Sequence, residues 1–176
     1  DRPASSSPCH PLSWPERERA DFEMTTQTGG CQCGAVRFRC EVEAETASIC
    51  HCRMCQKAFG SFYAPLVHTR GGTLVWTKAE PKRFRSSSYA SRGFCAECGT
   101  PLTYETAEAV SIAIGALDDP GAVPPLVQDG VEGKIAYVDG LHILAGRVTE
   151  EDPEFAAVAA TIVSHQHPDA PSSGEA

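Results

Sequence analysis

CQCG at residues 31–34, CHCRMC at residues 50–55 and CAECG at residues 95–99 are the three stretches that decide the fold. A CxC or CxxC pair sits in a tight turn that aims two sulfurs at one point, as in a metal knuckle. These spacings are too short for a framework of long-range disulfides. Two pairs and one triple within about 70 residues therefore predict zinc binding.

The number of clustered cysteines predicts how the metal sites are divided. The three stretches hold seven cysteines, whereas two closed four-thiolate zinc sites need eight. Two facing knuckles complete a tetrahedron, so we expect a closed site made of Cys31, Cys33, Cys95 and Cys98. The remaining triple forms a site with an open fourth position, made of Cys50, Cys52 and Cys55. An open position is typical of a catalytic or ligand-binding zinc, although His51 or His68 could close it instead.

The other two cysteines are expected to lie outside both sites. Cys40 falls on the inward side of an alternating segment at residues 36–42, which predicts a small core residue. Cys9 lies in a polar leader. An iron–sulfur cluster is disfavoured because the ferredoxin Cx2Cx2C run is absent and CxCxxC is too tight for it.

Length, composition and net charge limit which kinds of protein this chain can be. The chain has 176 residues, 41% of them hydrophobic, which suits one domain with a core. Its net charge of -8 argues against a nucleic-acid groove, which needs a basic stripe. It has no apolar run of about 18 residues, so we expect no transmembrane helix and no membrane partner. Residues 1–23 lack the apolar core of a signal peptide, so we expect a cytoplasmic protein with reduced thiols.

The chain is predicted to divide into three parts. Residues 1–23 form a disordered leader, residues 24–164 a zinc domain, and residues 165–176 a disordered tail. Strand-like segments in the domain are residues 36–42, 63–68, 73–77, 84–89, 102–105 and 110–115.

Two local signals predict how some of these elements connect. Gly71 and Gly72 indicate a hairpin between the strands on either side of them. Thr149 and Asp152 form a variant of a capping box at the start of a short C-terminal helix. The apolar face of that helix, which we expect to pack against a sheet, consists of Phe155, Val158, Ala159, Ile162 and Val163.

The cysteine stretches and their flanks resemble the glutathione-dependent formaldehyde-activating enzyme family, which includes centromere protein V-like proteins. The matching segments are residues 29–38, 50–57, 84–87 and 92–102. The order and spacing of all seven clustered cysteines match the family. The resemblance implies a mainly β, β-tent fold of small antiparallel sheets tied together by zinc. It also implies a structural zinc on the outer knuckles and a catalytic zinc on Cys50, Cys52 and Cys55.

The resemblance further implies an activity. In the family, formaldehyde condenses with glutathione to S-(hydroxymethyl)glutathione, a carbon–sulfur lyase reaction, so the expected partner is a small thiol. The family's His-x-Trp segment is replaced here by residues 134–141, which affects the expected ligand. A non-catalytic zinc-stabilised binding module and a thiol sensor are the alternatives.

The expected mechanism uses the thiol as a nucleophile. Its sulfur would take the open position at the triple and lose its proton there, ready to attack a small aldehyde. Three thiolates make the zinc a poor Lewis acid, which disfavours water activation. Arg53 and Lys57 flank the triple and could neutralise a carboxylate of the thiol, although simple solvation is the plainer expectation.

Overall fold

The computed structural model describes residues 24–170. The predicted leader, with Cys9, and the last six residues of the predicted tail lie outside the described residues. The described part is mainly β with two sheets, which confirms the predicted fold class. None of its helices has the length and apolar character needed to cross a membrane.

The smaller sheet has three antiparallel strands in the order β1-β2-β5. Their bounds are β1 Met24–Gly30, β2 Arg37–Glu43 and β5 Val75–Trp76. The larger sheet has seven strands in the order β10-β3-β4-β9-β8-β7-β6, all antiparallel except the parallel pair of β10 and β3. Their bounds are β3 Ser48–Cys50, β4 Ala64–His68, β6 Lys82–Arg85, β7 Ser91–Phe94, β8 Pro101–Glu105, β9 Val110–Ala113 and β10 Val127–Asp129.

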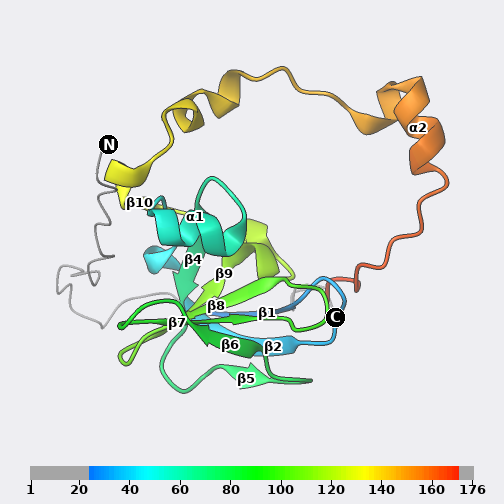
Figure 1. Ribbon diagram of the computed structural model, residues 1–176. Coiled ribbons are helices and arrows are strands. Elements are labelled where there is room, and N and C mark those ends of the chain that lie inside the picture. Colours follow the sequence, from blue (N-terminus) through cyan, green and yellow to red (C-terminus); the bar gives the residue numbers. More distant parts are fainter. Residues whose placement is uncertain (1–23, 171–176) are drawn as a thin grey trace.

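Two α-helices and several short 3-10 turns connect or follow these strands. The helices are α1 Arg53–Phe59 and α2 Pro153–Ala159. The 3-10 turns are Ala44–Thr46, Ile114–Ala116, Pro120–Ala122, Val131–Gly133, Ala136–Ile143 and Thr149–Glu151. In Figure 1, α1 lies over the end of the larger sheet, next to β4 and β10.

The core lies where the two sheets face each other. Alternate residues of β2 point inward, as the sequence pattern predicts, and Cys40 is buried among them as expected. The largest fully buried apolar side chains of this core are Phe38, Val42, Val67, Leu102, Ile112 and Val123. Complete burial of one such side chain stabilises the fold by about 1.5–3 kcal/mol. Burial also raises the pKa of the Cys40 thiol to about 12, so it stays neutral in the core.

The hairpin predicted at Gly71 and Gly72 is wrong. The chain does turn there, but β4 belongs to the larger sheet, whereas β5 pairs with β2 in the smaller one. The glycine pair therefore carries the chain from one sheet to the other. A turn signal fixes the local reversal, but it does not determine which strand the next segment finds as its partner.

The predicted C-terminal helix forms, but its start, its end and its packing differ from the prediction, since α2 ends at Ala159, before Ile162 and Val163. Asp152, not Thr149, is the N-cap, because its carboxylate accepts hydrogen bonds from two N–H groups of the first turn. The face expected to pack against a sheet is exposed, with Phe155 at 50% and Val158 at 56%. Figure 1 shows this part of the chain, from yellow to red, arching away from both sheets.

A nearly buried ion pair joins the smaller sheet to the segment after β9. Arg37 on β2 donates two hydrogen bonds to Asp118, at 2.9 and 2.5 Å, and Thr28 donates a third. The side chains of Arg37 and Asp118 are only 12% and 4% exposed. Burial acts to raise the pKa of Asp118, but the bonds from Arg37 and Thr28 hold it below its ordinary value.

We predict that Asp118→Asn lowers the free energy of unfolding by about 3 kcal/mol, because a buried guanidinium loses its counter-ion. Asp118 has a depressed pKa in the folded state, so its contribution is present above the unfolded pKa of about 3.9 and is lost as the pH falls through the folded value. Urea unfolding at pH 7 and pH 3 measures both effects. The difference between wild type and variant should be smaller at pH 3.

Asp139→Asn is the matched control. Asp139 is 70% exposed in its ion pair with Lys134, so its loss should change stability by less than about 1 kcal/mol. Equal effects of the two substitutions would contradict a special role for the buried pair.

Candidate metal centres

The two outer knuckles occupy the turns of two β-hairpins. Cys31 and Cys33 lie in the turn between β1 and β2, where Cys31 N–H donates to Val36 C=O at 3.0 Å. Cys95 and Cys98 lie in the turn between β7 and β8. Because β1 belongs to the smaller sheet and β7 to the larger, the two turns bring the sheets together at one point.

Left-handed glycines close both knuckles. Gly34 has φ of 72° and donates its N–H to Cys31 C=O, and Gly99 has φ of 79° and donates to Cys95 C=O. A side chain is disfavoured at such φ values. At Gly34 a Cβ would also meet the imidazole of His167, whose backbone N–H donates to Gln32 C=O at 2.7 Å. The C-terminal segment therefore returns to cover the first knuckle.

The four outer cysteines come together as a set with metal-ligand geometry. Their sulfurs all lie within 4.8 Å of one another. Cys33 Sγ lies 3.5 Å from Cys31 Sγ and 3.8 Å from Cys95 Sγ. A tetrahedral zinc with Zn–S bonds of about 2.3 Å places its sulfurs roughly 3.8 Å apart. The donor set therefore fits the closed site predicted from the sequence.

The thiols of this cluster differ in acidity. A hydrogen bond from the Ala35 N–H lowers the pKa of Cys33, but the Cys31 thiol and burial outweigh it and raise that pKa to about 12. At Cys98, burial acts to raise the pKa, but the hydroxyl and N–H of Thr100 lower it to about 6. A metal ion that binds all four sulfurs would displace whatever thiol protons remain, so metal binding at this cluster should depend on pH.

The three central cysteines form a second cluster at the junction of β3 and α1. Cys50 ends β3, Cys52 is the N-cap of α1, and Cys55 lies in its first turn. Their sulfurs lie within 4.8 Å of one another. Cys55 is buried, whereas Cys50 and Cys52 are partly exposed. The sequence predicted this triple but not the helix, because seven residues are too few to show an apolar period.

A buried glutamine side chain and a backbone hydrogen bond hold the chain around this cluster. The Gln56 amide donates to His51 C=O at 2.7 Å and to Gly133 C=O at 2.9 Å. The backbone N–H of His51 donates to Asp129 C=O at 2.8 Å. These bonds fix the segment after β10 against the Cys50–Cys52 turn.

Neither histidine suggested as a fourth ligand joins the triple. Within residues 24–170, no fourth His, Cys, Asp or Glu places a ligand atom with these three sulfurs. The His51 ring is fully buried, with Nε2 at 3.0 Å from Gln128 Oε1, and it meets the Tyr63 ring in a T-shaped contact with centroids 5.7 Å apart. His68 lies at the far end of β4, where burial lowers its pKa.

A cation that the sequence analysis did not single out contacts the triple. Arg92 on β7 is 3% exposed and donates from Nη2 to Cys55 Sγ at 3.2 Å. Arg53 and Lys57, selected because they flank the triple, are both exposed, and Arg53 donates to Gln56. Arg92 lies 37 residues after Cys55, so no local spacing could have linked them.

Comparison with known proteins identifies one family. A family model described as glutathione-dependent formaldehyde-activating enzyme matches residues 26–131. An uncharacterized lyase of Schizosaccharomyces pombe is 31% identical over 81 residues, or 46% of this chain. That match covers 58% of the yeast protein's length. A crystal structure of a Rhodobacter sphaeroides protein aligns with a TM-score of 0.48 and 20% identity, over 57% of this chain and 98% of that one.

We predict that Cys95→Ser removes one tightly held metal ion per chain and unfolds the domain. Structural zinc contributes roughly 10 kcal/mol or more of apparent binding free energy, and here its ligands join two sheets. Metal analysis and thermal melting measure the two effects. Cys40→Ala is the matched control, because Cys40 is equally buried but lies outside both clusters. A soluble Cys95→Ser variant with unchanged metal content and melting temperature would refute the assignment.

Proposed function

Because the chain belongs to the glutathione-dependent formaldehyde-activating enzyme family, we propose that it is a zinc-dependent carbon–sulfur lyase. Its substrates would be a small thiol of the glutathione type and the adduct of that thiol with a small aldehyde. The family match and the lyase name of the yeast relative support a lyase-type role. A cytoplasmic location, where thiols stay reduced, belongs to the same proposal.

The observation that carries the proposal is the division of the seven cysteines into four and three. Cys31, Cys33, Cys95 and Cys98 would hold a structural zinc. Cys50, Cys52 and Cys55 would hold a second zinc with three protein ligands, the pattern of catalytic rather than structural sites.

A bound zinc at the triple would keep a thiol substrate deprotonated at neutral pH. The chain's own residues would tune the charge around that thiolate. Three thiolates outweigh the charge of one divalent ion, so this environment favours a sulfur nucleophile over activation of water. Arg92 offsets part of the excess negative charge through its hydrogen bond to Cys55.

The cluster is also held in position for this chemistry. Cys52 and Cys55 are fixed by the first turn of α1, and Gln56 anchors that turn to Gly133. Partial exposure of Cys50 and Cys52 leaves a side on which a small thiol can approach. A rigid cluster with one accessible side suits a reaction that binds and releases a small thiol.

The test is a titration of cobalt-substituted protein with glutathione. Addition of the thiol should change the cobalt absorption of the wild type, because sulfur joins the three-cysteine site. Cys52→Ser should abolish the change and keep the fold, since serine is a good N-cap for α1 and the four-cysteine site is untouched. Cys40→Ala is the control and should respond like the wild type.

Two other results would replace the lyase proposal by one of its alternatives. If the wild type is indifferent to glutathione and to other small thiols, the proposal fails and a zinc-stabilised binding module takes its place. If thiols bind but no aldehyde adduct is formed or cleaved, the site acts as a thiol sensor.

A further inference from the structure

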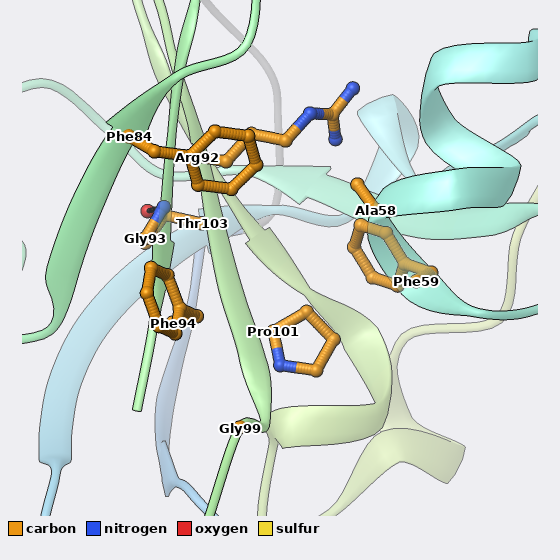
Figure 2. Close-up of a pocket in the computed structure, with 9 residues that line it drawn as sticks. All are labelled: Ala58, Phe59, Phe84, Arg92, Gly93, Phe94, Gly99, Pro101 and Thr103. Carbon is orange, nitrogen blue, oxygen red and sulfur yellow. Dashed lines mark hydrogen bonds between the residues drawn. The ribbon is translucent and has the colours of Figure 1, made fainter. Parts of the chain in front are cut away.

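A pocket of about 310 Å³ opens between α1 and the strands β6, β7 and β8. Its walls are mostly apolar, and Figure 2 shows Ala58 and Phe59 on the α1 side and Phe84, Phe94 and Pro101 on the strand side. Phe84 is 46% exposed, so part of this apolar wall faces solvent. Contact of apolar walls with water is unfavourable, so the pocket suits an apolar occupant.

The same chain carries an exposed apolar segment, the arm, which we define as residues 134–166. Figure 1 shows the arm arching away from both sheets, with α2 in its second half. On α2, Phe155, Val158 and Ala159 share one face because they are three and four residues apart. The exposed large apolar side chains of the arm include Ile143, Leu144, Val148, Phe155, Val158 and Ile162.

The arm begins beside the α1 wall of the pocket. Gln56, on the same helix as Ala58, donates to Gly133 C=O at 2.9 Å, directly before the arm. Early in the arm, the ring of Tyr137 meets Phe62 edge to face, with centroids 5.4 Å apart. These contacts fix the start of the arm on the α1 side.

The arm ends beside the opposite wall. Directly after it, the His167 N–H donates to Gln32 C=O at 2.7 Å. The Gln32 N–H in turn donates to Thr100 Oγ1 at 3.1 Å, and Thr100 lies between Gly99 and Pro101, which both line the pocket. The arm is therefore attached on both sides of the pocket.

The lengths of the connecting segments allow α2 to reach the pocket. Residues 160–167 join α2 to its second attachment and span at most about 27 Å when fully extended. That attachment is only one hydrogen bond away from Thr100 at the rim of the pocket. Residues 140–152 provide a longer connection on the other side. Because both ends of the arm are already fixed, docking α2 closes only short loops, and the entropic cost of closing loops grows slowly with their length.

The charges beside the two apolar surfaces are opposite in sign. Lys82 and Arg85 lie on β6 with the pocket residue Phe84, and all three are exposed. Glu151 and Glu154 lie at the start of α2 and are also exposed. Opposite charges beside two apolar surfaces favour their association and fix their relative orientation.

We propose that the arm is a lid, in which α2 closes over the pocket and buries Phe155 and Val158 in it. The apolar face of the helix and the apolar walls would then cover each other, which the hydrophobic effect favours. Phe59, on the α1 wall, packs against the buried group that contains Cys55, so the pocket borders the three-cysteine cluster. Closure would restrict the entry of water on that side of the cluster.

The first experiment locates α2 by photo-cross-linking of the full chain. The photoreactive residue p-benzoylphenylalanine replaces Phe155 in one variant and Ala157, on the opposite face of α2, in the matched control. Irradiation of the first variant should join α2 to a peptide from β6, β7 or β8 of the same chain, identified by mass spectrometry. The control should not give this product.

Two cross-linking results would overturn the lid. Products that join two chains only would mean that α2 docks on a second copy. Absence of any product between the Phe155 position and the pocket strands would mean that α2 does not dock there.

The second experiment measures exposed apolar surface with the dye 1-anilinonaphthalene-8-sulfonate. Phe155→Asp should raise the dye fluorescence about twofold or more, because the open lid leaves the pocket accessible. Ala157→Asp adds the same charge on the opposite face of α2 and should behave like wild type. Adding Phe84→Asp to Phe155→Asp should remove the increase, because it makes the pocket wall polar. Melting temperatures check that each variant is folded.

The sign of the dye response decides between an open and a closing arm. If α2 never closes, Phe155→Asp only removes exposed apolar surface, so the fluorescence falls or stays constant and the lid is wrong. Neither experiment uses a thiol or an aldehyde. The inference goes beyond the proposed function, and failure of one leaves the other unaffected.

Discussion

The fold depends on the meeting of two hairpin turns through four sulfurs. Cys31 and Cys33 come from the β1–β2 turn of the smaller sheet, and Cys95 and Cys98 from the β7–β8 turn of the larger one. The described part of the chain has few large aromatic core residues beyond the contact of Phe38 with Trp76. A small domain with a limited core gains much of its stability from such a junction.

The same junction also builds the candidate active site. Since the β7–β8 turn is held against the β1–β2 turn, β7 is fixed in place and carries Arg92 across to Cys55 on α1. The guanidinium thus connects the larger sheet to the three-cysteine cluster. Under the proposed function, the four-cysteine cluster would serve as the scaffold and the three-cysteine cluster, with Cys50 and Cys52 partly exposed, would carry out the chemistry.

The two wrong predictions concerned what a segment packs against, not whether the chain turns or forms a helix there. Gly71 and Gly72 correctly marked a reversal of the chain, but the strand that comes after them pairs with β2 because its apolar residue Trp76 fits against Phe38. The apolar face of α2 correctly marked a helix, but residues 134–166 lead away from the sheets, so that face stays exposed. Periodicity reports which face is apolar and carries no information about what it will contact.

The sequence by itself determined how the sulfurs are grouped, because the spacings CxC, CxCxxC and CxxC constrain sulfurs through the local backbone alone. Counting seven sulfurs against tetrahedral coordination was enough to expect four and three, and the sulfurs do gather in those two sets. The pocket and its cation were decided only by the tertiary structure. Arg92, Phe59 and Phe84 lie on three separate elements, and only the packing of α1 against β6 and β7 brings them together. Such a contact between distant residues depends on the packed chain as a whole, and no short stretch of sequence encodes it.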